Sequence, residues 1–147
     1  MQIFITRSTQ RIVLSFLIFL LAACSHISRF SPYAYEQSTS LKVESLDLMS
    51  KATEPYNDHK DEVEALKIKL EKAYEYAKGL PKNEISAKQW QILLDPKRNL
   101  LGGFLERWKN ESTLSEAFVR EEKGLVSDAF DTIIGLESGK IKGNEVE

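Results

Sequence analysis

The chain has few of the residues that build covalent cross-links, tight turns and catalytic centres. Its 147 residues include one cysteine, two histidines, four prolines and seven glycines. A single cysteine excludes a disulfide within the chain and a thiolate metal cluster, so the stability of the fold has to come from packing. The low glycine and proline content argues against a low-complexity chain.

The amino terminus has the organisation of an export signal. Arg7 and Arg11 lie in a short basic leader, and residues 12–21 form a nearly continuous apolar run of ten residues. Ten helical residues reach about 15 Å, which is about half the hydrocarbon thickness of a bilayer. This length is typical of the apolar region of a signal peptide and is too short for a comfortable transmembrane span.

The sequence Leu21-Ala22-Ala23-Cys24 ends this segment and resembles the lipobox of bacterial lipoproteins, whose pattern is leucine, two small residues and cysteine. The resemblance covers the export signal only. It implies cleavage before Cys24, thioether lipidation of Cys24 and acylation, as by palmitate, of the new amino terminus. Ser25, in place of an aspartate, implies the outer membrane of a Gram-negative envelope as the address. The alternatives are an uncleaved membrane anchor and an ordinary secretory signal in which Cys24 is incidental.

The domain organisation follows from this signal. We expect a signal peptide over residues 1–23, a lipidated tether over 24–32, a helical domain over 33–138 and a flexible tail over 139–147. The part after the signal has 18 basic and 22 acidic residues. Because a nucleic-acid partner requires a basic stripe, this acidic balance gives no reason to expect one.

The clearest helical pattern in the chain is a heptad seam. Its positions recur at alternating steps of three and four, which is typical of helices that pack at a shallow angle. An earlier helix is expected over residues 33–53, with serine and alanine on a face suited to close approach of another helix, and Pro55 separates the two. His59 is interpreted as an interface histidine near the start of the second helix. The seam consists of Tyr56, His59, Val63, Leu66, Leu70, Ala73, Ala77 and Leu80.

Three further helices are predicted from their start signals. Capping boxes place one helix start at Ser86 and another at Thr113, and Asp95-Pro96 predicts a helix that runs to about Lys109. Gly102-Gly103 lies inside that helix and either allows a close approach or a bend, or breaks the helix in two. No strand alternation is present in the sequence. The predicted fold class is therefore all-α, a small helical bundle of about four to five helices with one long heptad-patterned helix.

The inventory of chemically reactive groups is sparse. The sequence contains no pair of histidines at metal-binding spacing, no glycine-rich phosphate loop and no serine elbow. Neighbouring acidic residues such as Glu121 and Glu122 are interpreted as solvated charges, because adjacent side chains on a helix point in different directions. We therefore expect no enzymatic activity, no cofactor, no metal site and no small-molecule substrate.

The stretch from Trp90 to Trp108 is the most distinctive part of the sequence. Tryptophan and arginine dominate binding hot spots, so a partner interface is one interpretation of it. The simpler interpretation is that both tryptophans fill the core of the bundle. The candidate interface consists of Trp90, Arg98, Arg107 and Trp108.

These observations give a leading hypothesis and two others. The first is a lipid-anchored, non-catalytic helical scaffold or protein-binding module of the cell envelope, which binds another envelope component or self-associates along the seam from Tyr56 to Leu80. The second is a periplasmic inhibitor or immunity-type protein that binds a toxin or hydrolase. The third is an envelope hydrolase, which would need a cleft that gathers carboxylates beside Trp90 or Trp108.

Overall fold

The first helix among the described residues, α2 (Pro32–Ser50), begins at a cap within the predicted tether. The Ser31 hydroxyl accepts a hydrogen bond from the amide of Ala34 at 3.2 Å, and Pro32 occupies the first helical position, where its missing N–H costs nothing. The computed structural model describes residues 30–146. The predicted signal peptide, Cys24 and most of the tether lie outside the described residues.

Five α-helices form the described part of the chain, and no strand occurs among residues 30–146. The all-α prediction is therefore confirmed. Short 3₁₀ turns cover Lys51–Thr53, Tyr56–Asp58 and Gly143–Glu145. No helix in this part of the chain is both long enough and apolar enough to cross a membrane. The helices after α2 are α3 (Lys60–Gly79), α4 (Glu84–Leu94), α5 (Leu101–Glu111) and α6 (Glu116–Glu137).

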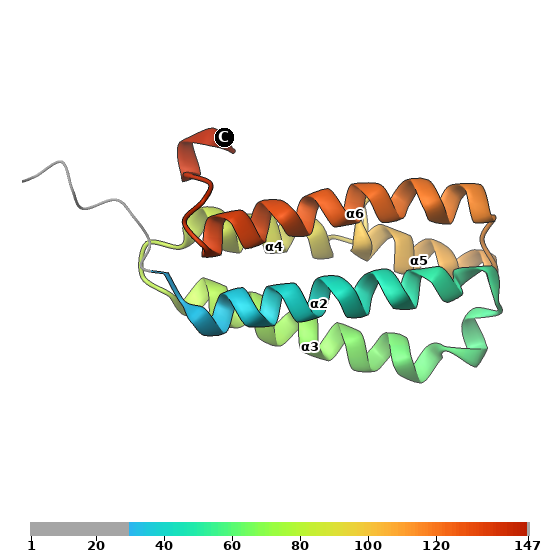
Figure 1. Ribbon diagram of the computed structural model, residues 1–147. Coiled ribbons are helices and arrows are strands. Elements are labelled where there is room, and N and C mark those ends of the chain that lie inside the picture. Colours follow the sequence, from blue (N-terminus) through green and yellow to red (C-terminus); the bar gives the residue numbers. More distant parts are fainter. Residues whose placement is uncertain (1–29, 147) are drawn as a thin grey trace, which may run out of the picture.

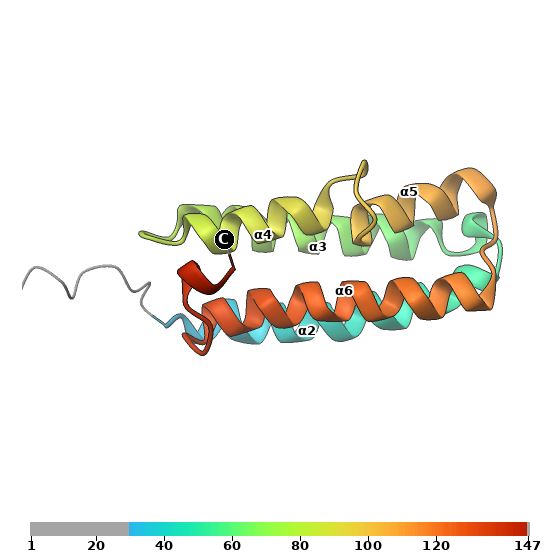
Figure 2. The same cartoon turned by 90° about the horizontal axis from the view of Figure 1, so that it is seen from above.

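The helices form an antiparallel bundle of four rods, one of which is the pair α4 and α5 in line (Figures 1 and 2). α2 packs against α3 and α6, and α4 packs against the same two helices from the other side. The topology is therefore up, down, up, down, with short connections. We call the end of the bundle that contains residue 30 the near end, and the opposite end the far end (Figure 1). The near end contains residues 30–35, 80–84 and 138–146, and the far end contains residues 51–59 and 112–115.

The predicted heptad seam packs inside this bundle. Its members from Val63 to Ala77 are buried, as is Tyr56, and they join one core with side chains of the other four helices. A bundle uses the same knobs-into-holes spacing as a coiled coil, so the pattern alone does not distinguish the two. The seam residues therefore pack within the chain, and self-association along them stays a prediction.

The connection between α4 and α5 differs from the predicted helix that starts at Pro96. Residues 95–100 form a turn in which Asp95 accepts from the amide of Lys97 at 2.9 Å, and α5 begins only at Leu101. Gly102-Gly103 then occupies the first turn of α5. A Cβ on Gly102 would overlap the carbonyl group of Leu94, and a Cβ on Gly103 would overlap that of Arg98. The glycine pair therefore permits a close approach and does not break the helix.

Two predicted helix starts also differ from the structure. α4 begins at Glu84, and Ser86 is buried, where its hydroxyl bonds to Glu137 of α6 and does not cap. α6 is capped by Ser115, which accepts from the amide of Phe118 at 3.3 Å, and not by Thr113. The N-cap residue of α4 is Asn83, whose side chain makes no capping hydrogen bond, whereas at α6 the cap is a hydroxyl two residues after the expected one.

The segment after α6 folds back on the near end of the bundle. Ile141 donates from its amide to the carbonyl of Gly135 at 3.0 Å, and its side chain lies over Gly135. Ile85 of α4 approaches Gly143 in the following 3₁₀ turn. The part of the expected tail that the structure describes, residues 139–146, is therefore packed against α4 and α6.

Candidate functional site

The structure separates the four residues of the predicted partner interface. Trp90 is 1% exposed and Trp108 is fully buried, so the tryptophans belong to the core and their inclusion in a surface interface was wrong. Arg98 and Arg107 are exposed but lie apart, one in the turn before α5 and the other on α5 itself. Cys24, the predicted lipid attachment site, lies outside the described residues.

The far end of the bundle contains the most connected polar cluster of the described chain. Two loops form its frame through backbone hydrogen bonds: the amide of Tyr56 donates to the carbonyl of Ser112, and the amide of Leu114 donates to the carbonyl of Ala52, both at 2.8 Å. These bonds fix the turn after α2 to the loop before α6. The turn can therefore hold its side chains in defined positions.

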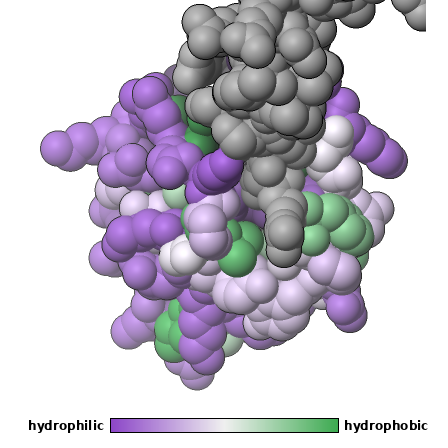
Figure 3. Space-filling view, turned by 90° about the vertical axis from the view of Figure 1, so that its left-hand side faces the viewer, coloured by the Kyte–Doolittle hydropathy of each residue, from purple (hydrophilic) through white to green (hydrophobic). Residues whose placement is uncertain are grey.

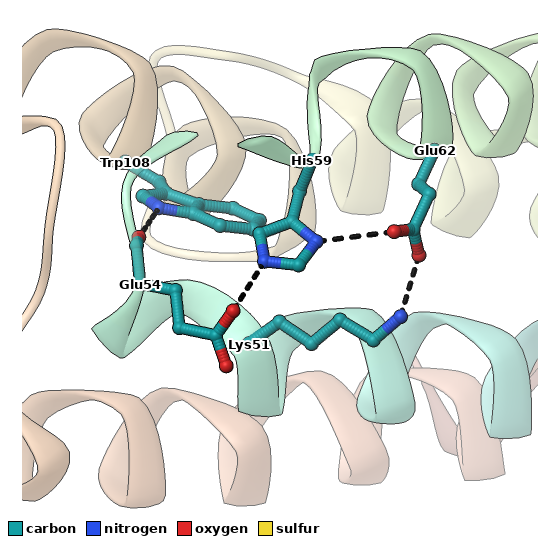
Figure 4. Close-up of polar contacts among 5 residues, drawn as sticks. All are labelled: Lys51, Glu54, His59, Glu62 and Trp108. Atoms are coloured by element: carbon teal, nitrogen blue, oxygen red, sulfur yellow. Dashed lines mark hydrogen bonds and ion pairs between the residues drawn. The ribbon is translucent and has the colours of Figure 1, made fainter. Parts of the chain in front are cut away.

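Trp108 lies beside His59 at the edge of this cluster (Figure 4). Its indole nitrogen donates to the backbone carbonyl of Glu54 at 3.0 Å. The ring of Tyr56 meets the indole edge-on, with centroids 5.5 Å apart, and the imidazole of His59 lies 5.7 Å from it at a tilt. The buried indole of Trp108 therefore packs against the imidazole of His59 and helps to position it.

His59 is held between two carboxylates. Its Nε2 lies 2.8 Å from a carboxylate oxygen of Glu54, and its Nδ1 lies 3.1 Å from one of Glu62. Ionised carboxylates only accept hydrogen bonds, so this arrangement favours the imidazolium form, in which both ring nitrogens donate. The hydrogen bond to Glu62, followed by the one to Glu54, raises the pKa of His59 above its ordinary value, against a smaller opposing effect of desolvation.

Lys51 extends the cluster on the other side of Glu62. Its ammonium group lies 2.6 Å from the second carboxylate oxygen of Glu62. The hydrogen bonds from Lys51 and then from His59 lower the pKa of Glu62, and the same bond raises the pKa of Lys51. Lys51, Glu62, His59 and Glu54 therefore alternate in charge and tie the turn after α2 to the first turn of α3.

The geometry suits a structural clamp better than proton transfer. A general base needs a free ring nitrogen within reach of a substrate proton, and both nitrogens of His59 are already bonded to carboxylates. Among residues 30–146 no group of three or more acidic, histidine or cysteine side chains is placed to hold a metal ion. The cluster holds the far end in one conformation while leaving its carboxylates partly exposed.

A groove of about 380 Å³ lies beside this cluster, between the end of α2 and the start of α6. Lys123 crosses it and donates to the hydroxyl of Ser50. The groove is open and carries both signs of charge. Its lining consists of Ser50, Thr53, Glu116, Val119, Arg120 and Lys123.

Arg107 of α5 lies against α6 at the contact between these two helices. Its guanidinium lies 4.1 Å from the ring centre of Phe118, and Phe118 stacks in parallel on Phe104 with centroids 6.1 Å apart. Glu122, one turn further along α6, is buried, which corrects its interpretation as a solvated charge. Burial, and then repulsion from Glu121, raises the pKa of Glu122, while Arg107 lowers it.

Sequence reasoning found His59 but not its partners. Glu62 lies three residues after His59 on the same helix, a spacing that indicates contact. Glu54 lies across the turn at Pro55, and no periodicity connects it to His59. Its position is set by the tertiary bond from Trp108.

A comparison with known proteins found no matching family model, no similar curated protein and no similar solved structure.

Proposed function

We propose that this chain is a non-catalytic helical module of the cell envelope that is anchored by lipid on Cys24 and presents its far end to a protein partner. The observation that carries the proposal is the arrangement of the bundle. The chain enters at residue 30 at one end, and the exposed polar cluster around His59 lies at the other (Figure 1). An anchor on Cys24 would therefore place the cluster on the side away from the membrane, which in the outer membrane is the periplasm.

The dimensions support such a display. α2 has 19 residues and is about 28 Å long. Cys24 precedes Phe30 by six residues, which span at most about 20 Å when extended. The far end would therefore stand about 3 to 5 nm from the lipid, within reach of another envelope protein.

Two measurements test this proposal. Mass spectrometry of protein purified from membranes should find the amino-terminal peptide beginning at Cys24 with the mass of a lipid modification, and Cys24→Ser should abolish that species. A photo-crosslinking residue at Asn57 in the far end should then give a discrete adduct, and one at Lys72 on the side of the bundle should not. An unmodified Cys24, or adducts of equal yield from both positions, would contradict the proposal.

A second candidate function is an inhibitor or immunity-type protein. The acidic residues around the far end, which outnumber the basic Lys51 and Lys60 there, favour it, because an excess of negative charge complements a basic enzyme surface and accelerates association. Deletion of the gene should then sensitise cells to a toxin-producing neighbour, and unchanged survival would count against this role. The exposed acidic residues of the far end and its flanking turns are Glu54, Asp58, Asp61, Glu62, Glu111 and Glu116.

A further inference from the structure

Four exposed aromatic side chains gather at the near end of the bundle. The ring of Tyr33 packs edge-on against Tyr76 with centroids 4.8 Å apart, and Phe30 lies 6.2 Å from Tyr35. The Ser31 hydroxyl lies 3.2 Å from the hydroxyl of Tyr76, which links the start of α2 to the last turns of α3. We call this group the aromatic collar; it consists of Phe30, Tyr33, Tyr35 and Tyr76.

The collar is unusually exposed for its size. Phe30 and Tyr33 are each 56% exposed, and Tyr35 and Tyr76 are each 37% exposed. The other large exposed apolar side chains of the described chain, Val43 among them, are aliphatic and lie on the sides of the helices. Single exposed aliphatic residues are ordinary, whereas a cluster of rings marks an interaction surface. Figure 3 views this end and shows pale and green residues grouped next to the grey segment.

The chemistry of the collar matches a lipid–water interface. Tyrosine combines a large apolar ring with a polar hydroxyl and is enriched at the headgroup level of membranes, and Phe30 adds a purely apolar ring beside the three tyrosines. Four basic and four acidic side chains surround the collar, so their charges balance and give an anionic lipid surface no net repulsion from this end. These charges belong to Lys78, Lys82, Lys140 and Lys142 and to Glu36, Glu75, Glu84 and Glu145.

The length of chain before the collar limits what can cover it. Six residues separate Cys24 from Phe30, and they span at most about 20 Å. We propose that the aromatic collar rests in the headgroup region of the membrane, so that the bundle stands end-on on the lipid surface. This inference rests on the proposed lipid anchor at Cys24 and adds an orientation to it. The far end then always faces away from the bilayer.

The test uses the full, lipidated protein in vesicles of phosphatidylethanolamine and phosphatidylglycerol that contain a headgroup spin-labelled lipid. A nitrobenzoxadiazole probe is attached to a single new cysteine, either at Glu36→Cys beside the collar or at Asn57→Cys in the far end; Cys24 does not react because its sulfur carries the lipid. We expect a blue-shifted, quenched probe at position 36 and a water-like, unquenched probe at position 57.

A pair of matched variants isolates the collar. Phe30→Ser with Tyr35→Ser should reduce quenching at position 36 by at least about twofold, because it removes two rings from the interface. Val43→Ser with Ile68→Ser removes two aliphatic side chains that are at least as exposed, but lie on the sides of the bundle, and should leave quenching unchanged.

The outcomes separate this inference from the anchor on which it rests. Protein that does not float with the vesicles contradicts the anchor and removes the collar proposal with it. Protein that floats with the vesicles but gives the same water-like emission at positions 36 and 57 overturns the collar alone. The comparison of the two probe positions needs no collar variant, so it decides the question even if the double substitution perturbs folding.

Discussion

Trp108 and Glu54 are 54 residues apart in the sequence, and a hydrogen bond of 3.0 Å joins the indole nitrogen of the first to the backbone carbonyl of the second. The carboxylate of the same Glu54 accepts from His59 at the surface. One residue therefore connects the core of the bundle to the polar cluster of the far end. A substitution at Trp108 should therefore change both the packing of the core and the polar cluster of the far end.

Trp108→Phe should lower the free energy of unfolding by about 2–3 kcal/mol, because it removes ring volume from the core and leaves the Glu54 carbonyl without its donor. Chemical denaturation monitored by circular dichroism measures this loss. The control is Trp90→Phe, which makes the same change in a buried ring that meets Phe130 edge-on in another part of the core. Equal losses in the two variants would show that the bond to Glu54 adds nothing.

His59 should make the stability of the protein depend on pH above the ordinary histidine pKa of about 6.5. Its pKa is raised in the folded state, so its contribution is fully present below the ordinary histidine value of about 6.5 and is lost as the pH rises through the folded value. Glu62, whose pKa is lowered, contributes above its ordinary value and loses that contribution as the pH falls through the folded value.

The pH dependence is measured by denaturation midpoints of the wild type and of His59→Gln at a series of pH values from 6 to 9. The wild type should lose stability across this range, and the variant should show a flatter profile because glutamine does not titrate. Parallel profiles for the two proteins would assign the loss to other groups. Lys51 titrates too far into the alkaline range to contribute there.

Glu137 should be the most important polar residue of the near end. It is 3% exposed, and its carboxylate accepts from Ser86 and, at 3.1 Å, from Asn83. Glu137→Ala removes the acceptor that these two buried side chains share, and we expect a loss of about 2–4 kcal/mol in the free energy of unfolding. Ser86→Ala removes one donor only and should cost about half as much.

Thermal and chemical denaturation of both variants test this ranking. If Ser86 acted as the helix cap that its sequence context predicts, the order would be reversed, because capping does not involve Glu137. A near-neutral Glu137→Ala would show that the near end is held by its apolar contacts alone.

The sequence predicted the features that depend on repetition along one chain segment. The heptad spacing from Tyr56 to Leu80 identified the buried face of α3, since periodicity within one helix reports which side faces the core. The class of fold followed from several such segments. The arrangement of the four rods in a ring could not be predicted from these patterns, because it depends on contacts between segments.

The features that sequence reasoning missed depend on single tertiary contacts. Ser86 and Thr113 each begin a capping-box pattern, but Ser86 is taken by Glu137 and the cap of α6 is Ser115. Glu121 and Glu122 were both interpreted as solvated because adjacent side chains on a helix point in different directions, yet one of those directions buries Glu122 while Glu121 stays exposed. A pattern identifies a residue that is able to make a contact, and the fold selects the partner.

Gly102 and Gly103 give the sharpest test of the junction between α4 and α5. In an ordinary helix, alanine in place of glycine adds about 1 kcal/mol of stability. Here a Cβ at either position would overlap a backbone carbonyl, of Leu94 for Gly102 and of Arg98 for Gly103, and backbone cannot move aside as a flexible side chain can. Gly102→Ala should therefore destabilise the protein, by about 2 kcal/mol or more.

The matched control is Gly124→Ala in the middle of α6, where a Cβ would meet nothing within 4 Å. That substitution should stabilise the protein by about 0.5–1 kcal/mol, since helix propensity is then the only effect that remains. Opposite signs in chemical denaturation would establish that the α4–α5 junction requires glycine for close approach. A stabilising Gly102→Ala would instead mean that the turn over residues 95–100 can move away from α5, so that α4 and α5 are not fixed in line as one rod of the bundle.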